Sequence, residues 1–344
     1  MPDAQPNDRK RVLDILWGFA ECRVLIAAVE LDIFTAIAKG HNTAKAVAAQ
    51  SEVSERGVRI LLNALTSMEF LSKKRTAYFL EPIAGRFLVK GRKGYMGANV
   101  LHAIHLWERW ATLTEAVKTG TAADLASARE RGARFFPILV EALFPINYPI
   151  ACEGYDQLGV GKTWKNIKVL DVAGGSAPWS VPVAERDPKS RVTLLDFPEP
   201  VKVARRFVKK HKVEKQFQFI ESNLWDVDWG TNQYDLFVLG HICHSEGEKK
   251  TREMIRRAFR ALKPDGKLLI AEMVADDRCA GPGSWPLMFA VNMLVNTEEG
   301  DTFTFSEYRR WCKAAGFRSF EALPVKEHSP LLVATKLIEI TAEI

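Results

Sequence analysis

The chain has 344 residues, 47% hydrophobic and 26% charged, a globular composition with room for two domains or for one domain with a large extension. Its formal net charge of +6 is a modest excess that does not by itself indicate binding to nucleic acid. The five cysteines lie far apart without a Cys-x-x-Cys pair, so we expect no disulfide framework, no zinc site and no metal cofactor. The sequence also lacks a signal peptide and an apolar run of membrane-spanning length, which predicts a soluble, cytoplasmic protein with no membrane partner.

The N-terminal third has the outline of a winged helix. Apolar residues recur at helical spacing over residues 11–39, which predicts two or three packed helices. Short helices are predicted at residues 43–49 and 54–67, and the apolar segments 70–72 and 78–80 flank a polar turn as a small hairpin.

A winged helix raises the alternative of a DNA-binding regulator. The helix that would enter DNA offers only Arg56 and Arg59 among mainly apolar residues, a poor supply of groups for contacting bases or phosphates. The basic residues at 73–75 suit a solvated turn equally well. We therefore expect no nucleic-acid partner.

Residues 95–150 continue as amphipathic helix rich in aromatic residues. Such residues can line a large apolar pocket, although core packing explains them as well. The aromatic residues concerned are Trp107, Trp110, Phe135, Phe136, Phe144 and Tyr148.

After Gly159, short apolar runs alternate with segments of helix length. This alternation predicts an α/β domain whose parallel sheet carries helices on both faces. The predicted strands are residues 167–172, 191–195, 217–220, 234–239 and 267–273, and residues 319–323 and 331–335 can add a terminal hairpin.

A candidate nucleotide site lies at the carboxyl ends of the first two predicted strands, where open parallel sheets bind ligands. Gly174 and Gly175 follow the first strand and allow backbone to approach a ligand closely. Asp196 ends the second strand and can accept both hydroxyls of a ribose. The Gly-x-Gly-x-x-Gly spacing that seats a pyrophosphate is absent, which weakens the alternative of an NAD-dependent oxidoreductase and favours a ligand without phosphates.

These features give the chain a resemblance to the small-molecule O-methyltransferases of bacteria and plants. The resemblance spans nearly the whole chain and is clearest at residues 170–180, 195–198, 234–244, 261–272 and 292–317. It implies a Rossmann-like, seven-stranded methyltransferase domain preceded by a helical, winged-helix dimerisation domain. It also implies a homodimer that transfers a methyl group from S-adenosyl-L-methionine to a small-molecule acceptor and releases S-adenosyl-L-homocysteine. The implied domains are residues 1–110 for dimerisation, 111–160 as a helical linker to the substrate pocket, and 161–344 for catalysis.

The resemblance also implies roles for residues at the cofactor site. Asp171, Gly174 and Gly175 would hold the methionyl end, Asp196 the ribose, and Phe197 would lie beside the adenine. The remaining cofactor candidates are Asn223, Leu224 and Gly240. Two positions depart from the family pattern, because Ala177 replaces a glycine and Asn223 replaces an acidic residue, and both changes bear on affinity more than on identity.

For the acceptor site, the resemblance implies that His244 is the catalytic base and that Glu272 helps to orient it. Methyl transfer requires alignment of the acceptor oxygen with the methyl group and removal of the acceptor's proton, which an imidazole can accept near neutral pH. The family's second orienting carboxylate is absent, since Thr302 occupies its position. Glu298 or Glu299 can replace it from a shifted loop, but a solvated acidic turn is the favoured interpretation of these two residues. A poorly oriented His244 would favour an acidic acceptor, such as a phenol or enol, or methylation of carbon.

Residues 276–294 form a loop that leads into an apolar helix, and in the resembling family this region covers the acceptor. We expect its apolar residues to form the substrate pocket and to select an apolar, aromatic or polycyclic acceptor, although core packing explains each residue singly. The residues are Trp285, Met288, Phe289, Asn292 and Met293.

Overall fold

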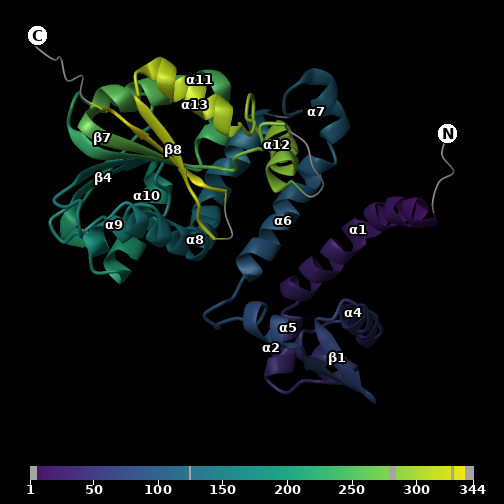
Figure 1. Cartoon of the computed structure of the whole chain (residues 1–344). Coiled ribbons are helices and arrows are strands. Elements are labelled where there is room, and N and C mark those ends of the chain that lie inside the picture. Colours follow the sequence, from purple (N-terminus) through teal and green to yellow (C-terminus); the bar gives the residue numbers. More distant parts are fainter. Residues whose placement is uncertain (1–5, 124, 279–283, 327–328, 338–344) are drawn as a thin grey trace, which may run out of the picture. The chain divides into compact units, whose positions relative to one another are not determined.

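The computed structural model describes residues 6–123, 125–278, 284–326 and 329–337 (Figure 1). The chain divides into two compact units, Met1–Glu108 and Arg109–Ile344. The segment 111–160 therefore lies in the second unit. No helix within the described ranges is both long enough and apolar enough to cross a membrane.

The N-terminal unit is helical and carries one two-stranded hairpin. Its elements are α1 (Pro6–Glu30), α2 (Ile33–Ala38), α3 (Ala44–Gln50), α4 (Glu55–Ser67), β1 (Leu71–Lys74), β2 (Ala77–Leu80), α5 (Pro82–Phe87) and most of α6 (Gly97–Trp110). The Ser54 hydroxyl accepts a hydrogen bond from the Gly57 backbone and begins α4, as its sequence position predicts. Leu62 and Leu65 of this helix are fully buried beside Phe34, and they form the centre of the unit's core.

The C-terminal unit is built on one seven-stranded sheet. Its strands are β3 (Lys168–Val172), β4 (Arg191–Asp196), β5 (Phe217–Glu221), β6 (Tyr234–Gly240), β7 (Leu262–Ala271), β8 (Ser319–Leu323) and β9 (Leu331–Thr335). Their order is β5-β4-β3-β6-β7-β9-β8, parallel from β5 to β7 and antiparallel at β9 and β8. The first strand therefore lies beside both β4 and β6, so the order reverses at the carboxyl end of β3.

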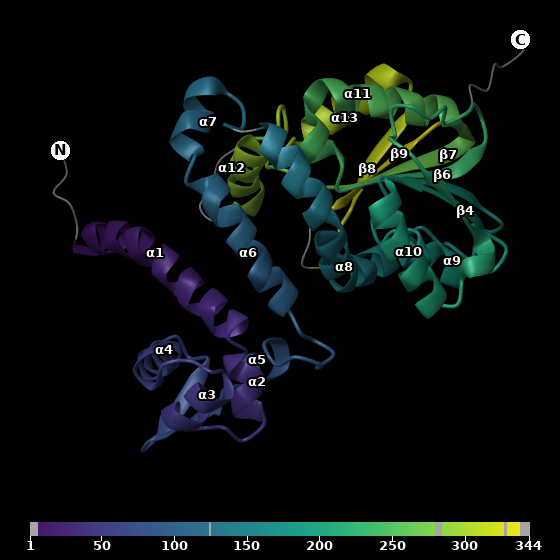
Figure 2. The ribbon, with the colours of Figure 1, turned by 180° about the vertical axis from the view of Figure 1, so that it is seen from behind.

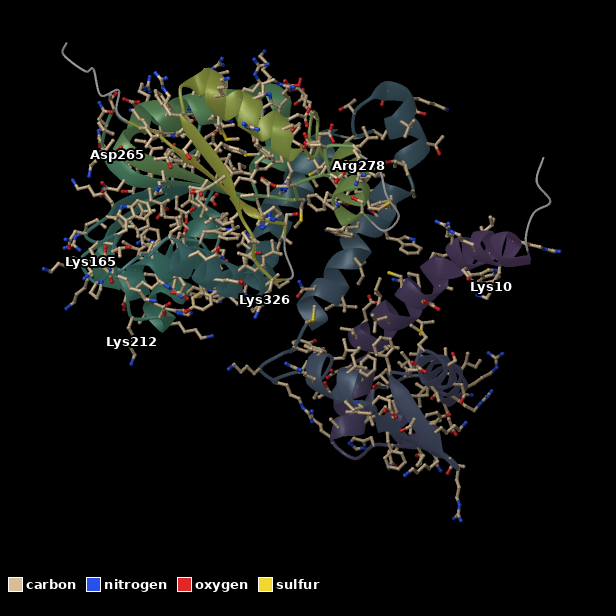
Figure 3. All side chains as sticks on the ribbon, in the orientation of Figure 1. Lys10, Lys165, Lys212, Asp265, Arg278 and Lys326 are labelled. Carbon is tan, nitrogen blue, oxygen red and sulfur yellow. The ribbon has the colours of Figure 1, made fainter. Side chains whose placement is uncertain are left out.

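Helices cover both faces of this sheet, with α11 and α13 on one side and α8, α9 and α10 on the other (Figures 1 and 2). The helices of this unit are α7 (Leu113–Thr119), α8 (Leu125–Gln157), α9 (Val181–Arg186), α10 (Pro198–Lys210), α11 (Cys243–Ala261), α12 (Trp285–Asn296) and α13 (Phe305–Ala315), with a short 3-10 turn at Glu214–Gln216. Alternate strand residues face opposite sides, so Val169 packs with α8 to α10 whereas Leu170 packs with α11 and α13. Charged residues such as Lys165, Lys212 and Asp265 point outward from this unit (Figure 3).

The predicted elements agree closely with this architecture, and the Rossmann-like fold is confirmed. The main difference lies in β7, which begins at Leu262 instead of residue 267. Pro264, Asp265 and Gly266 suggest a turn, but the strand continues through them with a register shift against β6. Helix α13 was not among the predicted elements, although Thr304 and Glu307 form a capping box at its start.

Candidate active site

A tight loop joins β3 to α9 and is tied to the end of β4. The backbone N–H of Gly175 donates to Oδ2 of Asp196 over 2.8 Å, and the backbone N–H of Phe197 donates to Oδ1 over 2.7 Å. Gly175 has a φ of +56°, in the left-handed region that favours glycine. A Cβ atom on Gly174 would lie 2.7 Å from Leu194 and 2.9 Å from Asp171. The loop therefore leaves no room for a side chain at Gly174 and favours glycine at Gly175.

Asp171 is completely buried next to this loop. Its Oδ2 accepts a 2.6 Å hydrogen bond from the Ser180 hydroxyl, whereas its Oδ1 has no partner among the described residues. Burial, together with the charge of Asp196, raises the pKa of Asp171 to about 7. Burial also raises the pKa of Asp196 to about 6, although hydrogen bonds from Gly175 and Phe197 oppose that increase. Two carboxyl groups with raised pKa values suit a cationic ligand, since a cation would stabilise their charged forms.

The other cofactor candidates occupy different environments. Phe197 is 53% exposed at the end of β4, so its ring is accessible to a ligand. Oδ1 of Asn223 accepts from the Trp225 backbone, which leaves the amide nitrogen as its donor. Leu224 is buried in the core on the α11 side, so its side chain packs there. A Cβ atom on Gly240 would lie 2.4 Å from the Trp179 ring, so this glycine makes room for Trp179.

Three residues without the freedom of glycine adopt positive φ at this edge of the sheet. Ala173, Ala177 and His241 have φ angles of 55°, 66° and 57°. Ala177 is the position at which the resembling family commonly has glycine, and its conformation explains that preference. The left-handed conformation costs a residue with a Cβ atom roughly 1–2 kcal/mol.

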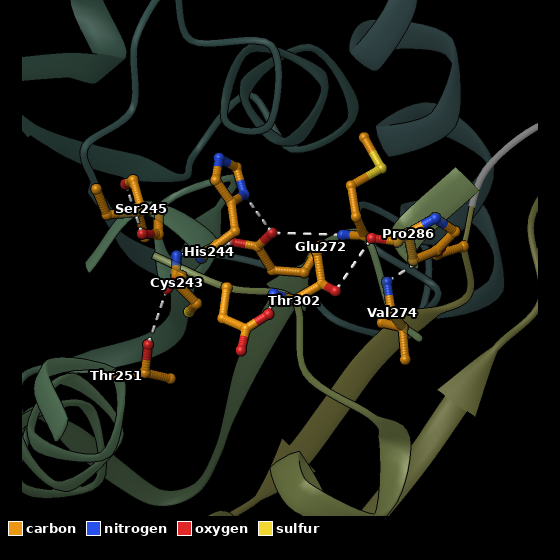
Figure 4. Close-up of polar contacts among 12 residues, drawn as sticks. Cys243, His244, Ser245, Thr251, Glu272, Val274, Pro286 and Thr302 are labelled. Carbon is orange, nitrogen blue, oxygen red and sulfur yellow. Dashed lines mark hydrogen bonds and ion pairs between the residues drawn. The ribbon is translucent and has the colours of Figure 1, made fainter. Parts of the chain in front are cut away.

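His244 and Glu272 form a close pair at the acceptor side (Figure 4). Nδ1 of His244 lies 2.6 Å from Oε2 of Glu272, and the carboxylate is 1% exposed. Its Oε1 accepts from the backbone N–H groups of Cys243, over 2.7 Å, and His244, over 3.3 Å. These bonds fix the carboxylate at the end of β7, and the carboxylate in turn fixes the imidazole at the start of α11.

The charge state of Glu272 follows from its surroundings. Burial acts to raise its pKa, but the charges of His244 and His241 and the hydrogen bonds from His244 outweigh burial and lower it. An ionised Glu272 favours the His244 tautomer whose Nδ1 carries a hydrogen. In that tautomer Nε2 has a lone pair and can accept a proton.

The loop before α13 holds His244 through its backbone. The backbone N–H of Asp301 donates to the His244 carbonyl over 2.9 Å, and a Cβ atom on Gly300 would lie 2.6 Å from the same oxygen. The Thr302 hydroxyl donates to the carbonyl of Pro286 over 3.1 Å, so this residue connects the loop to α12 (Figure 4). Glu299 packs its backbone against Gly247. The loop thus supports the backbone of His244, and it does not supply a second carboxylate at residue 302.

The predicted substrate residues of α12 occupy different environments. Phe289 contacts His244 edge-on, with ring centroids 5.0 Å apart and an interplanar angle of 87°, and Trp285 packs beside Phe289. Trp285 and Met288 are 62% and 53% exposed, whereas Met293 is buried. Oδ1 of Asn292 accepts hydrogen bonds from Trp110 and Asn296, so this side chain anchors α12. Residues 279–283, which belong to the segment predicted to cover the acceptor, lie outside the described ranges.

The sequence alone did not identify several residues of the site. Ser180 hydrogen-bonds Asp171, and the Ser176 hydroxyl donates to the Val140 carbonyl of α8 over 2.6 Å. Trp179 fills the space above Gly240. Ser176 and Ser180 lie in the segment after β3 that the sequence analysis identifies as part of the cofactor site, so their position alone could have indicated them. Their partners are 36 and 9 residues away, however, and only the fold brings them together.

Comparison with known proteins assigns this site to a family. The O-methyltransferase dimerisation domain matches residues 13–90, and the O-methyltransferase domain matches residues 162–318. The tetracenomycin polyketide synthesis 8-O-methyl transferase of Streptomyces glaucescens is 28% identical over 335 residues, covering 94% of this chain and 96% of that protein. The 3-hydroxy-5-methyl-1-naphthoate 3-O-methyltransferase of Streptomyces sahachiroi is 26% identical and covers 88% of each chain. The structure of human N-acetylserotonin methyltransferase with S-adenosylmethionine superimposes with a TM-score of 0.82 at 22% identity, over 98% of this chain and 100% of that chain.

The fold and the matched domains define an S-adenosylmethionine-dependent methyltransferase. The chain belongs to the O-methyltransferase family, whose members act on small molecules, and it carries the family's dimerisation domain.

Proposed function

We propose that the enzyme transfers the methyl group of S-adenosylmethionine to a phenol or enol hydroxyl, with His244 as the general base. The observation that carries this proposal is the 2.6 Å contact between His244 Nδ1 and the buried carboxylate of Glu272. Histidine in the tautomer that this contact favours can accept the acceptor's proton through Nε2. Glu272 is a positioning residue that holds the ring and stabilises the imidazolium formed.

The proposed cofactor site uses the residues around the loop after β3. S-adenosylmethionine supplies an electrophilic methyl group on a cationic sulfur, and its methionyl end carries an ammonium group. Oδ1 of buried Asp171 has no partner in the part of the chain that the structure describes and suits a cationic group, which supports the assignment of Asp171 to the methionyl end. Asp196 has the acceptor oxygens for ribose hydroxyls, and the exposed ring of Phe197 can stack on adenine. Asn223, Leu224 and Gly240 complete this proposed site; Leu224 offers backbone only and Gly240 provides space for Trp179.

The proposed acceptor is apolar and aromatic. Phe289 and Trp285 form an aromatic surface that continues from the imidazole of His244, which favours a planar acceptor. One relative is named for an aromatic acceptor, a hydroxynaphthoate, and another is named for O-methylation in the synthesis of the polyketide tetracenomycin. The absence of a carboxylate at Thr302 further favours an acceptor whose hydroxyl is already acidic. Methylation of carbon is the alternative, because an enolate presents carbon as well as oxygen.

We also propose that two copies associate through α1. The exposed apolar side chains of this helix need a partner surface, and the matched dimerisation domain supports a second copy as that partner. These side chains are Val12, Leu13, Ile15, Leu16, Trp17 and Phe19, with exposed fractions between 44% and 72%. The helical segment 111–160 is proposed to support the active site, since the Val140 carbonyl accepts from Ser176 and a Cβ atom on Gly175 would lie 3.2 Å from Val140.

A thermal-shift comparison with S-adenosylhomocysteine and NAD, followed by a methylation assay on a panel of phenols, tests the function. S-adenosylhomocysteine should raise the melting temperature, because it binds the native state. The assay should yield methyl ethers, as identified by mass spectrometry and NMR. Stabilisation by NAD alone, or products methylated only at carbon, would contradict the proposal.

A further inference from the structure

A second imidazole lies beside the His244 and Glu272 pair and has no part in the proposed methyl transfer. One potential ligand atom from each of His241, His244 and Glu272 lies within 4.8 Å of the other two. Ligands bound at ~2.1 Å to a tetrahedral zinc ion lie roughly 3.4 Å apart. Small side-chain rotations are therefore enough to bring these three atoms around one ion.

The backbone fixes His241 in this position. Its N–H donates to the carbonyl of Ala271 over 2.9 Å, and its φ of 57° turns the chain sharply between β6 and α11. The ring lies between those of Trp179 and His244, with centroid distances of 5.8 and 6.0 Å. Two histidines three positions apart thus face one carboxylate across the edge of the sheet.

Glu272 is prepared to act as a ligand by the backbone around it. Oε1 accepts from Cys243 and His244, which holds the group rigidly, while Oε2 is the oxygen that contacts an imidazole nitrogen. A buried carboxylate of fixed orientation supplies the negative charge that a divalent cation requires. Both histidines are half-buried, so the site remains accessible from outside.

We propose that His241, His244 and Glu272 form an inhibitory binding site for a divalent transition-metal ion of the zinc class. Imidazole and carboxylate ligands suit zinc and cobalt, and three protein ligands leave a coordination position for water. The ion would bind Nδ1 of His244 in place of the proton that lies between His244 and Glu272, and the neutral ring would then carry its hydrogen on Nε2. His244 would then no longer be able to accept a proton from the acceptor, so methyl transfer would stop while the cofactor site stayed intact.

This inference goes beyond the proposed function, and metal binding tests it without an activity assay. Full-length chain without a histidine tag is titrated with Co²⁺, whose visible absorption reports nitrogen and oxygen ligands, and with Zn²⁺ in competition with a chromogenic chelator. Wild type should bind one ion per chain. His241→Asn removes the imidazole, and asparagine tolerates the backbone conformation of this residue. The variant should weaken metal binding at least roughly tenfold. Tenfold is the smaller effect expected when a residue that supports a metal ligand is lost, so losing a ligand itself should cost at least as much.

His211→Asn is the matched control, because His211 also contacts a carboxylate, that of Glu185, over 2.8 Å outside this site. It should leave binding unchanged. In the methylation assay, Zn²⁺ should inhibit wild type and His211→Asn more strongly than His241→Asn. A wild-type chain that binds no more Co²⁺ or Zn²⁺ than His241→Asn would overturn the proposal, whatever the catalytic role of His244. Equal inhibition of all three chains would overturn the inhibitory role.

Discussion

The charge of Asp196 acts on Asp171 across the loop after β3 and adds to burial in raising the pKa of Asp171 to about 7. One buried oxygen of Asp171 has no partner within the described ranges. The cofactor-free protein therefore holds a carboxyl group that is ready to ionise when a cation arrives. This property makes the proposed cofactor site testable by both stability and proton release.

The first prediction concerns Asp171→Asn. The pKa of Asp171 in the folded state lies above its ordinary value of 3.8, so between about pH 4 and pH 7 the unfolded chain loses its proton first. The free energy of unfolding of the wild type without cofactor consequently falls as the pH rises from about 4 to about 7. Asparagine does not titrate, so the variant does not lose this stability. We expect Asp171→Asn to be more stable than wild type at pH 8 and nearly equal at pH 4, with an upper limit of roughly 4 kcal/mol. Urea unfolding at both pH values measures the difference.

Asp14→Asn is the control for this comparison, because Asp14 is exposed. Its stability difference from wild type should stay small at both pH values. A constant difference for Asp171→Asn across the pH range would show that Asp171 titrates normally.

The second prediction concerns proton release on cofactor binding. A bound cation should lower the pKa of Asp171 and that of Asp196, which are about 7 and about 6 without it. Near pH 6.5, binding of S-adenosylmethionine should therefore release protons to the buffer. Isothermal titration calorimetry in two buffers of different ionisation enthalpy detects this release. Asp171→Asn should release fewer protons, and identical heats in both buffers for wild type would contradict the prediction.

The third prediction concerns His244 and Glu272. His244→Ala should lower kcat by roughly 10²-fold or more and leave the affinity for S-adenosylhomocysteine nearly unchanged, because general-base catalysis is lost. The decrease should be smaller for more acidic phenols. His211→Ala, which removes an imidazole outside the site, should retain wild-type kcat. Unchanged turnover of His244→Ala would remove this residue from the mechanism.

Glu272 is tested as a positioning residue by comparing two variants. Glu272→Gln keeps the size of the side chain but loses the charge, so it should lower kcat and shift the acidic limb of the pH–rate profile, which reports the protonation of the general base. Glu272→Asp keeps the charge at a longer distance and should recover part of the activity. If both variants changed only melting temperature, Glu272 would have a structural role alone.

The fourth prediction concerns the strained alanine of the cofactor loop. Ala177 is fully buried with a φ of 66°, so Ala177→Gly relieves backbone strain in the folded state. This gain offsets the loss of stability caused by the greater entropy of the unfolded chain. We expect this variant to lie within about 0.5 kcal/mol of wild type. Ala184→Gly changes an equally buried alanine inside α9, where glycine has no such advantage, and should lose about 1 kcal/mol. Thermal unfolding of the two variants side by side gives the comparison, and equal losses would argue against strain at Ala177.

The fifth prediction concerns self-association through α1. Leu16→Glu places a charge on an apolar residue that is 63% exposed, and it should convert a dimer into monomers. Val117→Glu makes the same change at a residue that is 65% exposed on α7, and it should leave the dimer intact. Light scattering at micromolar concentration distinguishes these outcomes. A monomeric wild type would contradict the proposed dimer.

Much of the fold follows from local patterns in the sequence. The alternation of apolar runs with helical segments reproduces the strands from β3 to β9 to within a few residues, because buried parallel strands leave continuous apolar runs. Gly174, Gly175 and Asp196 were also found from their places at strand ends. Hydrogen-bond partners that lie far apart in the sequence could not be predicted. Nothing in the sequence near Asp171 specifies Ser180 as its donor, and nothing near His244 specifies that residue 301 holds its carbonyl. Such contacts depend on how distant segments pack.

The role of Gly240 shows the same limit. The resemblance alone makes Gly240 a cofactor candidate, and the structure adds that the Trp179 ring occupies the space that a side chain at this position would need. His241 is not among the predicted site residues, and the turn after β6 brings it next to Glu272.

The hydrogen bond from Gly175 to Asp196 also bears on the kinetics of cofactor exchange. Since a hydrogen bond within the protein holds the loop, the cofactor meets a preorganised surface and little chain entropy is lost on binding. Each carboxylate oxygen can accept more than one hydrogen bond, so ribose hydroxyls can join without displacing the backbone. The loop can then keep one shape through successive turnovers, and release of the spent cofactor need not wait for it to refold.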